Sequence, residues 1–309
     1  MDVRILGGLS VCENGVSITP TAAAPRQVLA LLAASADQVV PATVLMAELW
    51  PSGGPRGARA ELHAHITGLR ALIAAALHDG DRRAGEGRTS DGRTGEGRTA
   101  DGRTAETVLA AQSGGYRLDT GGGSHDVGRF ERAAGAGYRA MEAGDLSRAA
   151  LRLGEALALW RGEPYEGVAA GPRLRAETAR LAASRMSVLD QWVEAQLGLG
   201  KHAEMVPELA TLVARHPVNE ALHAQFMVAL LRSGRTEDAL DVYQRLCGAL
   251  LVDGDREPSA RLRRLYRSLL TVRDGARPPR VPAQAPGVWA RTPRLVPAFA
   301  GASFAGAPV

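Results

Sequence analysis

The sequence PRGARAELHAHITGLRALIAAAL, residues 55–77, decides the fold of the N-terminal part of the chain. Its apolar residues recur at steps of three and four, which predicts an amphipathic helix with one buried stripe. At about 100° per residue, that stripe comprises Ala58, Leu62, Ile66, Leu69, Ile73 and Ala76. The opposite side carries Arg56, His63, Thr67 and Ala71, with Arg59 and Arg70 on its flank. Such a face suits a DNA major groove, where arginine pairs with guanine, and an ordinary solvated helix face is the alternative interpretation.

Short apolar runs and turn residues surround this helix. A small antiparallel sheet is expected at 3–7, 9–11 and 16–18, with a hairpin turn at Asn14-Gly15. Two further helices are predicted before residue 55, one starting at Pro25 and one at Pro41, because proline suits the first turn of a helix. Two strands at 107–110 and 116–118 then follow the three helices, which predicts a wing.

Residues 79–105 are of low complexity. The ten residues 86–95 recur almost unchanged at 96–105, and glycine and alternating charge leave nothing to bury. We therefore expect a flexible insert between the third helix and the wing.

The second half of the chain is predicted to be almost entirely helical. Glycine precedes a polar helix start at Gly144, Gly200 and Gly234, and the last two are 34 residues apart, which is the tetratricopeptide period. Stacked helix pairs of this kind usually bind other proteins. The predicted domains are therefore 1–120, a winged helix-turn-helix of mixed α and β structure, and 125–272, an all-α tetratricopeptide-like domain. The fold class is mostly α, and residues 273–309, rich in Pro, Ala, Gly and Arg, are expected to be disordered.

Composition excludes several classes of protein. The 309 residues carry a net charge of +4, but the first 78 hold five basic and five acidic side chains, so a DNA interaction must rest on local geometry. The only lysine, Lys201, lies outside any phosphate-binding loop, which excludes that type of nucleotide hydrolysis. Cys12 and Cys247 lack metal-ligand spacing, and no apolar run could span a membrane. We expect a cytoplasmic protein with no cofactor, no metal and no membrane association.

The order of these parts resembles the Streptomyces antibiotic regulatory protein family, whose members join an OmpR-type winged helix to a bacterial transcriptional activation domain. The resemblance covers about residues 1–272. In the first half it is carried by Arg4-Ile5-Leu6-Gly7, Pro25-Arg26-Gln27-Val28-Leu29, Leu49-Trp50, Ala58-Arg59 and Gly115-Tyr116-Arg117-Leu118. In the second half it is carried by Asp126-Val127, Arg129-Phe130, Ala156-Leu157-Ala158-Leu159-Trp160-Arg161-Gly162, His216-Pro217 and Ser233-Gly234-Arg235.

This resemblance implies a pathway-specific transcriptional activator of antibiotic or other secondary-metabolite genes. Its third helix would lie in the major groove of double-stranded promoter DNA containing direct repeats. Two protomers would bind side by side, and the helical half would support the homodimer and recruit RNA polymerase. The residues that the resemblance and the helix geometry together assign to DNA are Arg26, Arg56, Arg59, His63, Thr67, Arg70 and Arg117.

Two other functions are weighed against this one. Gly68 and Ala71 stand where family members often carry basic residues, so a tetratricopeptide-like interaction scaffold with weak or lost DNA binding is the alternative. An enzyme is not expected, because His63 and His65 are two apart on a helix and point in different directions. Leu62, Ile66 and Leu69, with Trp50, Tyr116 and Trp160, are expected to be packing residues.

Overall fold

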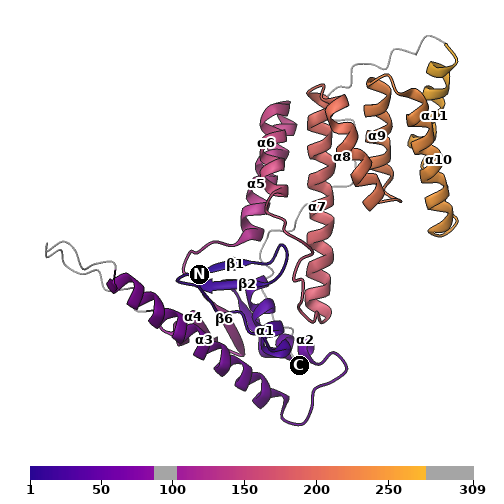
Figure 1. Cartoon of the computed structure of the whole chain (residues 1–309). Helices are drawn as coiled ribbons and strands as arrows, with labels where there is room; N and C mark the ends of the chain where they lie inside the picture. Colours follow the sequence, from indigo (N-terminus) through magenta and orange to yellow (C-terminus); the bar gives the residue numbers. More distant parts are fainter. Residues whose placement is uncertain (87–102, 276–309) are drawn as a thin grey trace, which may run out of the picture. The chain divides into compact units, whose positions relative to one another are not determined.

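The computed structural model describes residues 1–86 and 103–275 (Figure 1). Its strands are β1 (Asp2–Arg4), β2 (Ser10–Glu13), β3 (Val16–Ser17), β4 (Val39–Pro41), β5 (Leu109–Gln112) and β6 (Gly115–Leu118). Its helices are α1 (Ala23–Ala34), α2 (Ala42–Leu49), α3 (Ala58–Glu86), α4 (Ala105–Val108), α5 (Asp126–Glu142), α6 (Leu146–Leu157), α7 (Pro172–Gly198), α8 (His202–Arg215), α9 (Glu220–Arg232), α10 (Thr236–Val252) and α11 (Ala260–Arg273). The mostly helical fold class predicted from the sequence is confirmed.

The described residues form two compact units, and the boundaries between them fall inside α5, α6 and α7. The first unit comprises Met1–Tyr138 and Arg148–Val193, and the second comprises Arg139–Ser147 and the described residues from Glu194 on. The first unit thus contains the winged helix together with most of α5, α6 and α7. A domain limit near residue 120, as the sequence predicts, does not coincide with this division.

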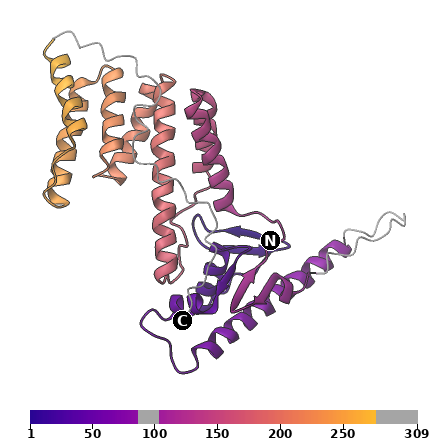
Figure 2. The same cartoon turned by 180° about the vertical axis from the view of Figure 1, so that it is seen from behind.

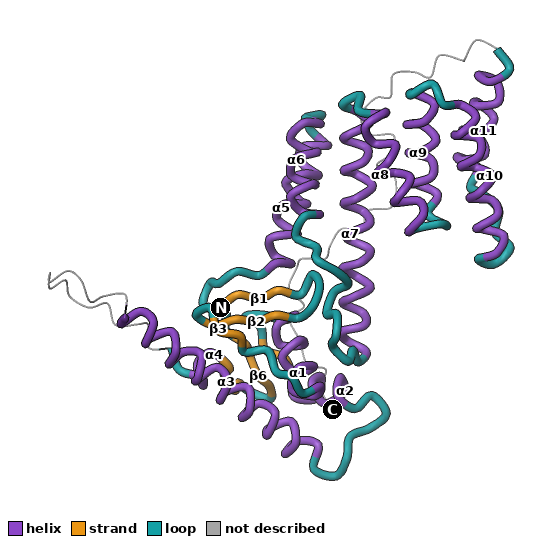
Figure 3. The backbone as a smooth tube through the Cα atoms, viewed as in Figure 1, coloured by secondary structure: helices purple, strands orange, loops and turns teal. Residues whose placement is uncertain are grey.

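The N-terminal sheet has the predicted antiparallel hairpin. β1, β2 and β3 lie in that order, with Val3 opposite Val11 and Glu13 opposite Val16. The turn between β2 and β3 places Asn14 at φ 50° and Gly15 at φ 76°, as a two-residue turn of this type requires. Figure 3 shows these strands in orange, beside the helices of the winged-helix part.

The first two helices begin elsewhere than their prolines predict. α1 begins at Ala23, so Pro25 is its third residue. Pro41 is the last residue of β4 and the residue before α2, with an extended backbone at ψ 140°, so it does not open the helix from within. The core between α1 and α3 is formed by the fully buried side chains of Leu29, Leu32, Leu62, Ile66 and Leu69.

The wing has three strands where the sequence predicts two. β4 and β5 both pair antiparallel with β6, with Val40 opposite Tyr116 and Ala110 opposite Arg117. A Cβ atom at Gly115 would lie 2.2 Å from the Val40 carbonyl oxygen, so this close approach of β4 requires glycine. The predicted strand at 107–110 is wrong in its first half, because Thr104 caps the single helical turn α4 that ends at Val108.

The low-complexity segment is partly ordered at its edges. α3 continues to Glu86, so the residues from Asp79 to Glu86 are helical, in contrast to the predicted loop. At the other edge, Arg103 contacts the buried carboxylate of Glu13 at 3.1 Å and donates to the Asp119 carbonyl oxygen at 2.7 Å. The central residues 87–102, like the tail from 276, lie outside the described part of the chain.

The three glycines singled out in the second half do end helices. Gly144, Gly200 and Gly234 have φ values of 75°, 81° and 77°, and each is followed two residues later by the start of α6, α8 or α10. In the second unit, α9 packs against both α8 and α10, and α10 packs against α11 (Figure 2). This succession of antiparallel helix pairs is the tetratricopeptide-like arrangement expected from the 34-residue spacing.

Candidate DNA interface

Helix α3 has a sharply divided surface. Leu62, Ile66, Leu69 and Ile73 are each 1% exposed or less and face the core, as do most of the apolar positions predicted for the buried stripe. Ala58, the first of those positions, is only half-buried. On the other side of the helix, Arg59, His63 and Thr67 are exposed, and Arg56 is exposed in the turn just before it. The structure therefore brings four of the seven predicted DNA-contacting residues together on one surface.

Two of these residues are linked by a hydrogen bond. The Thr67 hydroxyl donates to the main-chain carbonyl oxygen of His63 at 3.0 Å, one helical turn earlier. The hydroxyl proton of Thr67 is therefore used in a hydrogen bond within the helix itself.

Arg70 is placed differently from the other predicted contacts. Its Nε and Nη2 atoms both donate to the Leu109 carbonyl oxygen, at 3.0 and 2.8 Å, and the side chain is half-buried. Leu109 begins β5, so this arginine ties the flank of α3 to the first wing strand after it. The helix and the wing are thereby held in register through a charge-assisted pair of hydrogen bonds.

Arg117 and Arg26 lie outside α3. Arg117 is half-buried on β6, where its Nη2 lies 3.1 Å from a carboxylate oxygen of Asp119. Arg26 lies in the first turns of α1, and its Nη1 lies near Gly167 in the connection between α6 and α7. The Nε atom of Arg26 is buried without a hydrogen-bond partner among the described residues. These two arginines therefore have neighbours within the first unit that the sequence did not indicate.

Two buried carboxylates hold the winged helix to the helices that follow it. Asp126, at the start of α5, accepts hydrogen bonds from the main-chain N–H groups of Ile5 and Leu6 at 2.9 to 3.0 Å. It also accepts from Arg161 Nη2 at 2.8 Å, while only 4% of its surface is exposed. The Arg161 and Tyr165 amides donate to the carbonyl oxygens of Leu6 and Ile5. Main-chain hydrogen bonds thus join the segment between α6 and α7 to the residues that directly follow β1.

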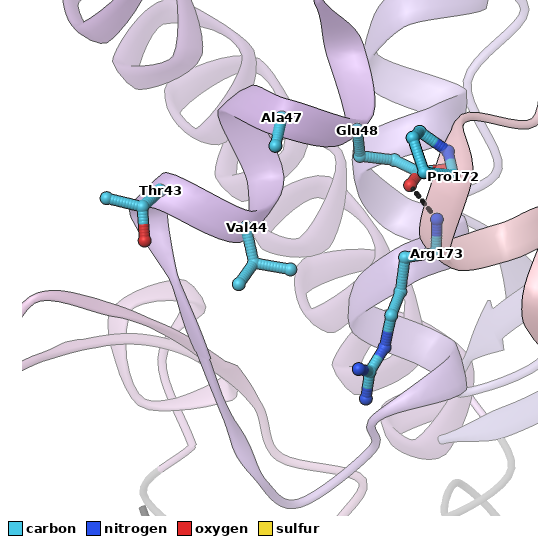
Figure 4. Close-up of a pocket in the computed structure, with 6 residues that line it drawn as sticks. All are labelled: Thr43, Val44, Ala47, Glu48, Pro172 and Arg173. Carbon is cyan, nitrogen blue, oxygen red and sulfur yellow. Dashed lines mark hydrogen bonds between the residues drawn. The ribbon is translucent and has the colours of Figure 1, made fainter. Parts of the chain in front are cut away.

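Glu48, near the C-terminal end of α2, is the second buried carboxylate that joins the winged helix to a later helix. Its carboxylate accepts from the main-chain N–H group of Arg173 at 2.7 Å (Figure 4). It also accepts from that of Leu174 at 3.3 Å, and both residues are in the first turn of α7. A carboxylate at a helix N-terminus satisfies free amides and opposes the positive end of the helix dipole. Gln27 on α1 donates to the Glu48 carbonyl oxygen at 2.8 Å. One residue therefore connects α1, α2 and α7.

Sequence reasoning missed Asp126 and Glu48 as structural centres. Both are ordinary acidic residues in their local sequence, and the main-chain amides that their carboxylates bind lie more than 100 residues away. The one local indication is for Glu48, which lies within an apolar run, where a carboxylate must find donors if it is buried.

The hollow beside Glu48 is small and does not resemble a cofactor site. It measures about 210 Å³ and is lined by Thr43, Val44, Ala47, Glu48, Pro172 and Arg173 (Figure 4). Among the residues that the structure describes, no group of His, Cys, Asp and Glu side chains is arranged to hold a metal ion. None of the described helices is both long and apolar enough to cross a membrane.

Comparison with known proteins places this architecture in a family. The bacterial transcriptional activator domain matches residues 125–270. The regulatory protein DnrI of Streptomyces peucetius is 42% identical over 290 residues, which cover 92% of this chain and 98% of DnrI. The regulatory protein AfsR of Streptomyces coelicolor is 36% identical over 240 residues, covering 77% of this chain and 21% of AfsR.

A solved structure extends the likeness to three dimensions. The EmbR protein of Mycobacterium tuberculosis, in complex with a low-affinity phosphopeptide, superposes with a TM-score of 0.73 at 28% identity. The match covers 88% of this chain and 65% of that structure. The chain therefore spans about two thirds of EmbR and about a fifth of AfsR, but nearly all of DnrI. With its winged helix, its activator domain and a relative matched along nearly its whole length, the chain belongs to the Streptomyces antibiotic regulatory protein family of transcriptional regulators.

Proposed function

We propose that this regulator binds double-stranded promoter DNA through the exposed side of α3 and activates transcription of a secondary-metabolite pathway. The observation that carries the proposal is the division of α3 into a fully buried apolar side and an exposed side with Arg59, His63 and Thr67. An α-helix of this kind fits the major groove, and arginine there pairs with the O6 and N7 atoms of guanine. The name of DnrI, a regulatory protein, is consistent with this role.

The predicted residues take different parts in this interface. Arg59 and His63 would contact base edges, and Arg56, in the turn before α3, would contact phosphate. Arg70 would act by holding the wing against α3, since Leu109 already engages two of its nitrogen atoms. Arg117 on β6 and Arg26 on α1 would contact the DNA backbone.

The remaining parts of the proposal concern partners. Two protomers would occupy direct repeats side by side, and the tetratricopeptide-like helices would support the homodimer and contact RNA polymerase, as stacked helix pairs commonly bind proteins. The protein would work in the cytoplasm, by binding and not by catalysis, and without a cofactor.

Binding to genomic DNA tests the proposal. The purified full chain is mixed with sheared genomic DNA, bound fragments are sequenced, and the best fragment is titrated at several salt concentrations. We expect short direct repeats upstream of a biosynthetic cluster, with an affinity that falls as salt rises because bound counterions are released. Failure to enrich any sequence over a control protein at low salt would contradict the proposal.

One observation favours the alternative of an interaction scaffold. Between Ala60 and Leu77 the only Lys or Arg is Arg70, and it is half-buried against β5. Few cations on the helix mean few phosphate contacts and a shallow salt dependence. If the genomic experiment enriches nothing, the partners to be sought are proteins that bind the helices of residues 125–272.

A further inference from the structure

Thr67 stands at the centre of the exposed side of α3 with its polar group already engaged. Its hydroxyl donates to the His63 carbonyl oxygen at 3.0 Å, and the residue is exposed. Threonine in a helix takes this rotamer when its hydroxyl bonds one turn back. The group that it offers to an incoming surface is then its methyl, and not a hydrogen-bond donor.

Besides His63, one helical turn before it, the exposed neighbours of Thr67 on α3 are small and apolar. Ala64 and Ala71, three residues before it and four after, are both exposed. Gly68 has no atom within 4 Å of the place where a Cβ would stand, so the helix surface beside Thr67 is open. A base edge could therefore approach the Thr67 methyl closely.

We propose that Thr67 determines DNA specificity by packing its methyl group against the C5-methyl group of a thymine in the major groove. The inference rests on the proposed placement of α3 in that groove. Thymine is the one standard base that shows a methyl there, and threonine and alanine are among the residues that contact it. 5-Methylcytosine carries the same group, so the test uses synthetic DNA that contains none.

The test begins with a binding site chosen by the protein. The full chain selects from a pool of synthetic duplexes with a randomised central segment, and the enriched duplex is resynthesised with one thymine at a time replaced by deoxyuridine. This replacement removes the methyl and leaves base pairing unchanged. At the contacted thymine in a repeat we expect binding to weaken about fourfold, the equivalent of about 0.8 kcal/mol for one buried methyl.

Two substitutions separate the methyl from the hydroxyl. Thr67→Val keeps a methyl and lacks the hydroxyl, so it should retain the fourfold loss at the same thymine. Thr67→Ser keeps the hydroxyl and lacks the methyl, so it should bind the thymine and deoxyuridine duplexes equally. Both changes are at an exposed site with similar helix propensities, and circular dichroism checks that each variant is folded.

The results separate the role of Thr67 from the DNA binding on which it rests. No enriched duplex at all would contradict DNA binding itself. An enriched duplex that tolerates deoxyuridine at every position, or that contains no thymine, would overturn the role of Thr67 and leave DNA binding intact. The role would also be overturned if Thr67→Ser kept the deoxyuridine penalty, or if Thr67→Val lost it.

Discussion

Replacing Asp126 with alanine should destabilise the first compact unit more than any surface substitution. Its carboxylate accepts from the Ile5 and Leu6 amides at 2.9 to 3.0 Å, and both of these residues are at most 1% exposed. In the Asp126→Ala variant these two amides lose a charged acceptor at a buried position. A fragment that ends at residue 120 would lack the same acceptor.

The magnitude follows from the number of amides left without a partner. Each buried unsatisfied N–H costs about 1–3 kcal/mol, so two of them give about 2–6 kcal/mol. Arg161 adds little, because its side chain is 43% exposed and can be hydrated once its partner is removed. Against a total stability of about 5–15 kcal/mol this is a large loss. The melting temperature of a unit this size should fall by roughly 10 °C.

Urea unfolding followed by tryptophan fluorescence measures the effect, because Trp160 packs edge-on against Phe130 of α5 in the same unit. Asp126→Asn is the matched variant, which keeps one acceptor oxygen and should lose about half as much. Asp238→Ala removes an exposed carboxylate that pairs with Arg235, and it should cost less than about 1 kcal/mol. If Asp126→Ala cost no more than Asp238→Ala, the reasoning would be refuted.

Three further predictions concern single residues. Arg59→Ala should weaken binding to the selected DNA by about 1–3 kcal/mol, measured by fluorescence anisotropy, while Arg152→Ala, which removes an exposed charge from α6, should leave it unchanged. Arg103→Ala should destabilise the fold by about 1–3 kcal/mol in urea, because it removes a partner of the buried Glu13 carboxylate, and a neutral result would show that this contact is dispensable. Burial raises the pKa of Asp190 from 3.8 to about 6, so the folded state binds this proton more tightly than the unfolded state. The protonated carboxyl therefore stabilises the folded state fully below about pH 4, and this contribution, at most about 3 kcal/mol, is lost as the pH rises through about 6. Asp190→Asn should flatten the curve of urea midpoints against pH in this range. An unchanged curve in the variant would assign the pH dependence to another group.

The elements that local periodicity specifies were predicted well from the sequence. The buried side of α3 follows from apolar residues at three- and four-residue steps, and Leu62, Ile66 and Leu69 are fully buried as expected. The glycines that end helices, among them Gly200 and Gly234, were recognised because a left-handed residue before a polar helix start is a local requirement.

The features that depend on distant partners were not predicted. β4 is only three residues long and exists because it pairs with β6, more than seventy residues later. From the sequence, Pro41 is therefore interpreted as the first residue of a helix, although it is the last residue of β4. Arg70 was predicted to contact DNA from the flank of the third helix, but its guanidinium is engaged by a carbonyl group of the wing, which helix geometry alone does not reveal.

The central claim, that α3 binds in the major groove, is tested most directly by methylation interference on the selected DNA. Dimethyl sulfate methylates guanine at N7 in the major groove and adenine at N3 in the minor groove. The account predicts interference at guanine N7 within each repeat, and its loss at one guanine when Arg59 is replaced by alanine. Interference confined to adenine N3, or a guanine pattern unchanged in Arg59→Ala, would contradict it.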